Sequence, residues 1–359
     1  MIWKSWQAPV RAAGQDREGN VSVGIRMEGL SKIYTSAPPS ALPRGAAYGM
    51  PRAPWKRKKQ ATRVVALDGI SLEVRSGEVF GLLGPNGAGK TTSVGILTTR
   101  VRPTAGEAWI GTYNVWKEKV RVKRLIGVVP QRPNLDFSLT AREILTFHGA
   151  YFQVSPPERT RRARELLERF KLTDRADDML AGFSGGMMQR LSIARAMMHD
   201  PEVLFLDEPS AGLDPQTRLL LWDMVRKYNA RGKTILLTTH NMEEADALCH
   251  RLAIVDHGHI IALGTPQELK QSIPGGYLIK LQLDGMTPDF QQELERLDGV
   301  TEVRTANGQI QIYSGRGGSL VLEVVRLAAK FQVGIRDVHI AEPSLENLFL
   351  HHTGRSLRE

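Results

Sequence analysis

The stretch that decides the fold is Gly84-Pro85-Asn86-Gly87-Ala88-Gly89-Lys90-Thr91-Thr92. A short apolar run, Val79–Leu83, precedes it, and a helical pattern begins near Lys90, which is the setting that a phosphate-binding P-loop requires. The glycines let the backbone curl so that successive N–H groups face a β-phosphate, while Lys90 offers a positive charge to the β- and γ-phosphates. The hydroxyl of Thr91 is suited to Mg²⁺. The stretch therefore predicts a nucleotide-binding loop.

A second apolar run, residues 203–206, ends in two acids, Asp207 and Glu208. Hydrolytic phosphoryl transfer calls for one carboxylate near Mg²⁺ and one near the attacking water. We therefore expect Asp207 to act on the metal side and Glu208 to act as the general base. An Asp-Glu pair after a strand is common by itself, but here Pro209, Ser210, Gly212, Leu213 and Asp214 follow at once.

The surrounding pattern predicts an α/β fold with a mostly parallel sheet. Short apolar runs at 79–83, 126–129, 203–206 and 235–237 alternate with helical patterns, which is typical of a sheet covered on both faces. Alternating residues at 24–30 and 65–74 predict half-buried strands of an antiparallel β subdomain, and the loss of strand signals between 138 and 180 predicts a helical subdomain. We expect a P-loop NTPase core with these two subdomains.

The ends of the chain differ from this core in their residue patterns. We expect a flexible tail at 1–23, a nucleotide-binding domain at 24–271 and a small accessory domain at 272–359. The last range reads as strand, helix, strand, strand, helix and strand, which suggests a split β-α-β unit of α+β type.

A proline-rich, basic insertion is expected at 35–63, within the nucleotide-binding domain. It closes on Trp55 and the basic residues 56–59, for which we weigh contact with an anionic membrane surface against a merely solvated loop.

Composition sets broader limits. Apolar residues make up 42% of the chain and charged residues 24%, as in ordinary globular proteins, and the formal net charge is +10. No stretch approaches the roughly 20 apolar residues of a membrane-spanning helix, and the start lacks the pattern of a secretion signal. Cys249 is the only cysteine, which excludes an intrachain disulfide and a cysteine-based zinc cluster.

The segment Phe183-Ser184-Gly185-Gly186-Met187-Met188-Gln189-Arg190 resembles the signature motif of ABC-transporter nucleotide-binding domains, and the resemblance covers about 24–269. A hydroxyl and two glycines at a helix start form a second anion-binding device. The resemblance implies an ATPase that uses ATP and Mg²⁺. It also implies a head-to-tail dimer in which Ser184, Gly185 and Gly186 contact the ATP held by the other subunit. Phe183 and Met187 depart from the usual leucine and glutamine.

Other positions match the family residue by residue, so their roles are implied by the resemblance. Gln131 corresponds to the loop glutamine that senses Mg²⁺ and the γ-phosphate, and His240 to the switch histidine. Asp214 corresponds to the loop that crosses the dimer interface. Tyr34 corresponds to the aromatic residue that stacks on adenine.

The segments 135–145 and 342–355 resemble the daunorubicin-resistance-type exporter branch. That branch implies a cytoplasmic subunit, peripheral to the cell membrane, that powers a separate multi-span permease, with a homo- or heterodimer of cassettes. Two alternatives stay open. A soluble ABC ATPase acting on nucleic acid or ribosomes would suit the positive charge. An importer ATPase with a regulatory C-terminal domain would suit the accessory domain.

Overall fold

The computed structural model describes residues 23–35, 63–273, 276–284, 288–306 and 309–354. The basic residues 56–59 of the predicted insertion, and the predicted tail apart from Val23, lie outside these ranges. Thr35 pairs with Arg63, so the two ends of the insertion meet at neighbouring strands. Within the described residues, no helix has the length and apolar character needed to cross a membrane.

A six-stranded sheet forms the centre of the molecule, with the strand order β10-β9-β3-β8-β7-β6. Its strands are β3 (Val79–Leu83), β6 (Ile126–Val129), β7 (Val203–Asp207), β8 (Thr234–Thr239), β9 (Arg251–Asp256) and β10 (His259–Gly264). All neighbours are parallel except β9 and β10. Every residue of β3, β7 and β8 is buried, which explains their continuous apolar sequences.

A smaller antiparallel sheet, ordered β2-β1-β4-β5, packs beside this core. Its strands are β1 (Val23–Thr35), β2 (Arg63–Arg75), β4 (Ala105–Ile110) and β5 (Tyr113–Asn114). Between the sheets lies an apolar core that includes Ile25, Leu67 and Phe80. The helix α1 (Lys90–Leu97) contributes Val94 and Leu97 to the same core, which fixes the loop before α1 relative to both sheets.

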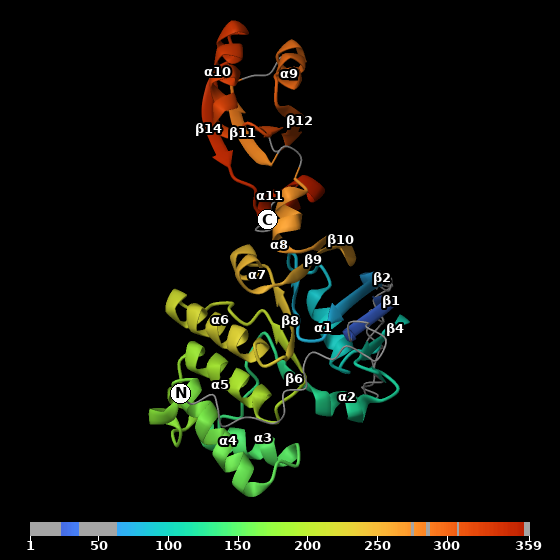
Figure 1. Ribbon diagram of the computed structural model, residues 1–359, viewed down its shortest axis with the longest axis vertical. Coiled ribbons are helices and arrows are strands. Elements are labelled where there is room, and N and C mark those ends of the chain that lie inside the picture. The colour runs from blue at the N-terminus through green and yellow to red at the C-terminus, as the bar shows by residue number, and fades with distance from the viewer. Residues whose placement is uncertain (1–22, 36–62, 274–275, 285–287, 307–308, 355–359) are drawn as a thin grey trace, which may run out of the picture.

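Further helices pack around these two sheets and extend to one end of the molecule (Figure 1). They are α2 (Lys119–Leu125), α3 (Ala141–Tyr151), α4 (Pro156–Arg169), α5 (Gly185–Met197), α6 (Pro215–Asn229), α7 (Met242–Leu248) and α8 (Pro266–Gln271), with short 3₁₀ turns at Thr173–Arg175 and Leu180–Gly182. Helix α4 illustrates how the sequence sets burial, because Ala163, Leu166 and Leu167 face the core while its charged residues face outward.

A third sheet, ordered β12-β13-β11-β14, lies at the opposite end of the molecule from α3 and α4 (Figure 1). It contains β11 (Tyr277–Leu283), β12 (Val300–Ala306), β13 (Gln309–Ser314) and β14 (Ile335–Ala341), and is packed with α9 (Pro288–Glu295), a 3₁₀ turn at Gly317–Leu320 and α10 (Val321–Lys330). Its own core includes Ile279, Phe290 and Val324. The last helix, α11 (Leu345–Thr353), instead packs Leu348 and Phe349 into the core of the ATPase part.

These sheets and helices confirm the predicted α/β fold: a mostly parallel central sheet, an antiparallel β subdomain, a helical subdomain and a small α+β unit at the C-terminal end.

Candidate ATP-binding and hydrolysis site

The P-loop connects β3 to α1, and its curl depends on glycine. Gly87 and Gly89 adopt positive φ angles of 84° and 109°. A Cβ on Gly84 would lie 2.2 Å from the carbonyl oxygen of Val255, so only glycine lets the loop pass this close to β9. Helix α1 begins without a side-chain cap and without an acidic residue in its first turn. Its N-terminal N–H groups are therefore suited to an anion.

Lys90 lies inside this loop and is only 4% exposed. Its Nζ donates to the carbonyl oxygens of Gly84 (2.7 Å) and Pro85 (3.0 Å), and lies 3.4 Å from Oε1 of Glu208. Burial lowers the pKa of Lys90, and the attraction of Glu208 opposes that effect. The loop thus holds one positive charge next to its uncapped N–H groups.

Thr91 and Asp207 meet at the predicted Mg²⁺ position. The Thr91 hydroxyl lies 3.3 Å from Oδ1 of Asp207, and Thr238 donates to the same oxygen at 2.6 Å. The parallel pairing of β7 with β8 places Asp207 opposite Thr238. A hydroxyl and a carboxylate are the hard oxygen ligands that Mg²⁺ prefers, and Mg²⁺ completes its shell with water and phosphate oxygens, so the residues present fit this ion.

Three predicted site residues, Lys90, Gln131 and His240, converge on Glu208. Its Oε2 accepts a hydrogen bond from Nε2 of Gln131 (3.0 Å) and lies 3.2 Å from Nδ1 of His240, while Oε1 faces Lys90. The carboxylate is 6% exposed, whereas the His240 side chain is 49% exposed. Four separate segments of the chain therefore meet beside the P-loop. They supply the predicted base Glu208, the ammonium of Lys90, the amide of Gln131 and the accessible imidazole of His240.

The signature residues lie elsewhere in the chain. The Ser184 hydroxyl caps α5 by accepting from the backbone N–H of Met187 (3.3 Å), and both Ser184 and Gly185 are exposed. Among the described residues, no hydrogen bond or ion pair joins Ser184, Gly185 or Gly186 to residues 84–92. The anion-binding groups of this helix start are therefore accessible from outside the chain.

Asp214 caps the neighbouring helix α6. Its carboxylate accepts from the backbone N–H (2.9 Å) and the hydroxyl (2.6 Å) of Thr217, and these hydrogen bonds hold the pKa of Asp214 below its ordinary value. A Cβ on Gly186 would lie 3.4 Å from the same Thr217. The starts of α5 and α6 thus lie side by side, and Asp214 is fixed next to the signature residues.

Tyr34 lies at the end of β1 and is 42% exposed. It pairs with Val64, two residues before Ala66, whose carbonyl oxygen borders Gly89 of the P-loop. The Lys32 ammonium lies 4.9 Å from the centre of its ring. No described contact links Tyr34 to residues 84–92 directly, so adenine stacking remains a proposal.

Three residues support the site without having been predicted. Thr238 holds both Asp207 and the backbone N–H of Glu208 (3.1 Å). Gln189 donates to the carbonyl oxygen of Pro209 (2.9 Å), which ties the signature helix to the segment after Glu208. Glu244 is fully buried and accepts from Nε1 of Trp222 (3.3 Å). The sequence signal for Thr238 was a threonine at the end of a strand, and the signal for Gln189 was its place in the signature segment. Glu244 gave no signal.

Comparisons with known proteins identify the family of this chain. The family profile described as ABC transporter matches residues 67–211. The Linearmycin resistance ATP-binding protein LnrL of Bacillus subtilis is 38% identical over 84% of this chain and 98% of that protein. A Nod factor export ATP-binding protein I of Burkholderia thailandensis is 41% identical over 82% of this chain and 94% of that protein.

Two further comparisons concern a drug-resistance protein and a solved structure. The Doxorubicin resistance ATP-binding protein DrrA of Mycobacterium tuberculosis is 37% identical over 81% of this chain and 89% of that protein. A dimeric ATP-binding cassette in a post-hydrolysis state, bound to ADP and Pi, is 26% identical with a TM-score of 0.56, covering 67% of this chain and 98% of that one. The chain therefore belongs to the ABC transporter family, as an ATP-binding ATPase subunit.

Proposed function

We propose that this ATPase powers export through a separate membrane-spanning partner, and that two cassettes close on ATP during each cycle. The observation that carries the proposal is the convergence of Lys90, Gln131 and His240 on Glu208, beside the Thr91–Asp207 pair. The export assignment is supported by relatives that are named for drug resistance and Nod factor export.

The chain's own residues divide the chemistry between them. The N–H groups of the loop and Lys90 bind the phosphates, while Thr91 and Asp207 hold Mg²⁺, which neutralises charge on the phosphate oxygens when bound. Glu208 orients the attacking water and takes its proton. Gln131 and His240 hold the carboxylate of Glu208 at that position, and the exposed His240 is free to reach the γ-phosphate.

The outward-facing signature residues support the dimer. Ser184 and Gly185 lie at a capped but accessible helix start, next to Asp214. A second cassette in head-to-tail orientation would bring its own ATP to this helix start. Each ATP site would then be complete only when both subunits are present. ATP binding would therefore be linked to the closing of the two cassettes on each other.

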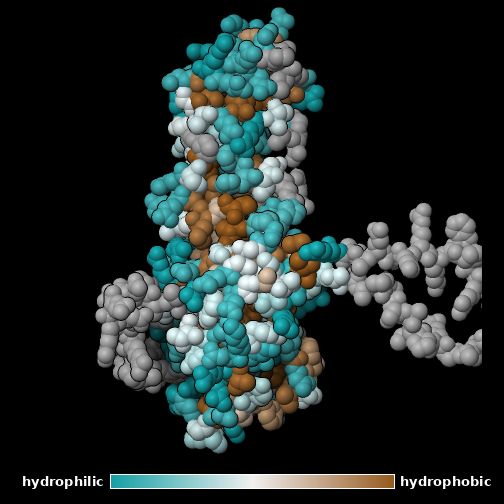
Figure 2. Space-filling model, turned by 90° about the vertical axis from the view of Figure 1, so that its right-hand side faces the viewer, coloured by the Kyte–Doolittle hydropathy of each residue, from teal (hydrophilic) through white to brown (hydrophobic). Residues whose placement is uncertain are grey.

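An apolar surface on the helical subdomain is suited to the membrane partner. Phe137, Phe147 and Tyr151 are 53%, 59% and 78% exposed, although such side chains are usually buried. They lie on α3 and on the loop that leads to it from Gln131. Figure 2 shows apolar residues among hydrophilic ones at the lower end of the molecule, the end where Figure 1 places α3. A partner bound here would respond directly to the position of Gln131.

The variant Glu208→Gln tests the dimer and the base together. It keeps size and hydrogen bonding but removes the basic carboxylate, so hydrolysis should slow by about 10² or more while ATP still binds. Size-exclusion chromatography with ATP should show a dimer that persists, whereas the wild type returns to monomer after hydrolysis. Adding Ser184→Arg should abolish that dimer by blocking the contact with the partner's ATP.

Two results would contradict the proposal. Wild-type hydrolysis by Glu208→Gln would show that another group is the base. A persistent dimer that is indifferent to Ser184→Arg would show that the signature residues do not contact ATP across the interface.

The membrane partner is tested by copurification from detergent-solubilised membranes. Wild type should bring down a multi-span protein, and Phe147→Ser/Tyr151→Ser should lose it while keeping ATP binding. The exposed pair Leu322→Ser/Val325→Ser on α10 serves as the matched control at the other end of the molecule. Equal recovery of the partner with both double variants would rule out the α3 surface.

A further inference from the structure

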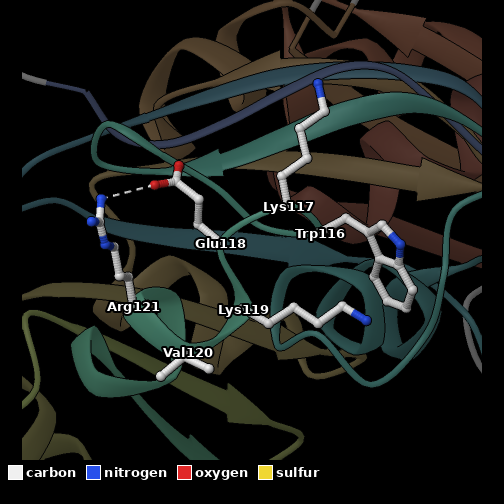
Figure 3. Close-up of a pocket in the computed structure, with 6 residues that line it drawn as sticks. All are labelled: Trp116, Lys117, Glu118, Lys119, Val120 and Arg121. Carbon is white, nitrogen blue, oxygen red and sulfur yellow. Dashed lines mark hydrogen bonds and ion pairs between the residues drawn. The ribbon is translucent and has the colours of Figure 1, made fainter.

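A basic surface surrounds α2 and has no part in the ATP site. Residues 116–125 carry five basic side chains and one carboxylate. We define the α2 surface by Trp116, Lys117, Lys119, Val120, Arg121 and Arg124. Figure 3 shows how most of these residues line a shallow hollow of about 460 Å³ at the start of the helix. A second hollow shares Trp116 and Lys117 and adds Arg102.

The acids near this surface leave most of its charge uncompensated. Lys117 pairs with Glu107 (2.7 Å) and Arg121 with Glu118 (3.1 Å). In the described part of the chain, no ion pair involves Lys119 or the exposed Arg124. Because exposed ion pairs are screened and weak, even the paired cations stay available to an approaching anionic surface.

Helix geometry turns this charge toward solvent. Val122 is fully buried and anchors α2 to the core, so Val120 and Arg124, two positions to either side, face the opposite way. Val120 is 70% exposed. Val120 is therefore an exposed apolar side chain between Lys119 and Arg121, and the seven-residue helix α2 presents mainly positive charge to its surroundings.

The surroundings of the Trp116 ring favour lipid headgroups over nucleic acid as the ligand of this surface. The Lys119 ammonium lies 3.1 Å from the centre of a Trp116 ring, and the Arg102 guanidinium lies 5.8 Å from a ring centre. Proteins that bind single-stranded nucleic acid need an open aromatic face on which a base can stack, and Lys119 covers this one. A half-buried tryptophan beside cations is instead typical of side chains at the boundary between lipid and water.

From this charge, shape and aromatic environment we infer that the α2 surface binds the headgroups of anionic phospholipids. Helix α2 lies in the same half of the molecule as α3, and α10 lies at the opposite end (Figure 1). The inference rests on the proposed function only for the orientation, because a partner bound at α3 would bring this half toward the bilayer. Headgroup binding would hold the ATPase at the membrane independently of its permease.

The test is sedimentation of the full chain with phosphatidylcholine vesicles, with and without phosphatidylglycerol, from low to high salt. The wild-type protein should bind the anionic vesicles and should dissociate from them as the salt concentration rises. One basic side chain near an anionic surface contributes about fivefold to binding, so Lys119→Ala/Arg124→Ala should weaken it about 25-fold. Val120→Asp should also weaken binding, because it places a carboxylate at the centre of the surface.

Arg326→Ala/Lys330→Ala on α10 is the matched control, since it removes the same charge at the far end of the molecule. It should leave vesicle binding within about twofold of wild type. Equal weakening by the two double variants would overturn the inference, as would equal binding to neutral vesicles. All these variants should keep wild-type ATPase activity in solution, so failure here is distinct from failure of the Glu208→Gln dimer experiment.

Discussion

At the scale of single residues, Glu208 combines a strained backbone with a dense set of contacts. Its φ is 47°, in the left-handed region that non-glycine residues rarely adopt. The backbone N–H of Glu208 is held by both the carbonyl and the hydroxyl of Thr238. This conformation sends the Glu208 side chain toward Lys90 and Gln131, while Asp207, one residue earlier, turns to Thr91. Two adjacent acids therefore serve two different positions.

Lys90→Ala tests the charge inside the P-loop. The variant removes the ammonium that faces the carbonyls of Gly84 and Pro85, so the phosphates lose a charged donor. ATP affinity should fall by at least tenfold and turnover should be lost, measured by calorimetric titration and phosphate release. Lys330→Ala, on α10 at the opposite end of the molecule from α3, is the control for a general effect of charge. Normal hydrolysis by Lys90→Ala would contradict the site assignment.

Glu244 is a fully buried carboxyl behind the site that accepts from the indole N–H of Trp222. Burial raises the pKa of its carboxyl, with hydrogen bonds from Thr239, Ser210 and Trp222 acting in the opposite direction. Glu244→Gln should keep ATPase activity within about twofold, because the amide keeps the size of the side chain and its oxygen can still accept from the indole N–H of Trp222. Glu244→Ala should lower the free energy of unfolding by about 1–3 kcal/mol, because the indole N–H of Trp222 loses its acceptor. Greater loss with Gln than with Ala, in thermal unfolding, would contradict this role.

At the scale of elements, the contact of α3 with the end of α5 is built from aromatic rings. Phe152 stacks on His199 with ring centres 3.7 Å apart, and His148 lies 5.5 Å from His199. Burial, as the largest cause, lowers the pKa of His148 to about 3 and that of His199 to about 4. The helical subdomain is thus attached to the core through imidazoles that remain neutral.

This contact predicts a loss of stability in acid. Both folded-state pKa values lie below the ordinary 6.5, so between pH 6.5 and about 4 the unfolded chain binds protons that the folded chain does not. Stability is therefore complete above pH 6.5 and falls as pH drops, by up to about 2 kcal/mol per imidazole at pH 5.

His148→Phe should keep the ring packing and remove about half of this acid loss, measured as denaturant unfolding at pH 7.5 and 5. His257→Gln is the control, because the side chain of His257 is 77% exposed. An unchanged difference between the two pH values in His148→Phe would show that other groups cause the acid sensitivity.

At the scale of the whole molecule, the C-terminal end returns to the ATPase part. Leu348 and Phe349 of α11 share a core with Leu248 of α7 and Leu269 of α8, whereas Phe290 belongs to the separate core under the third sheet. The elongated shape in Figure 1 therefore contains a separate core under the third sheet, and the boundary of that core does not follow the order of the chain. The predicted accessory domain at 272–359 remains a proposal, since its last helix packs with the other unit.

Two matched substitutions distinguish these cores. Phe349 and Phe290 are both fully buried, and replacement of either by Ala should cost about 3–5 kcal/mol locally. Phe349→Ala should lower the unfolding temperature of the part that ATP stabilises, whereas Phe290→Ala should leave that transition in place. Calorimetric scans with and without ATP would distinguish the effects of the two substitutions. An ATP-dependent transition that is insensitive to Phe349→Ala would show that α11 contributes little to the ATPase core.

The sequence by itself determined the local parts of this protein. The P-loop conformation depends on nine consecutive residues, because positive φ angles at Gly87 and Gly89 and an uncapped helix start are local properties. Continuous apolar runs identified the buried parallel strands, because a strand that is buried on both faces consists almost entirely of apolar residues. The resemblance of the signature segment added the family.

Only the tertiary structure decided which of these parts meet. Gln131 and Glu208 are 77 positions apart, and they touch because β6 and β7 are neighbours in a sheet whose strand order differs from the chain order. The return of α11 to the ATPase core and the outward turn of the α2 surface likewise depend on packing between distant segments. Residue patterns encode local backbone conformation and burial, whereas contacts across a parallel sheet depend on the free energy of the whole fold, which no single segment contains.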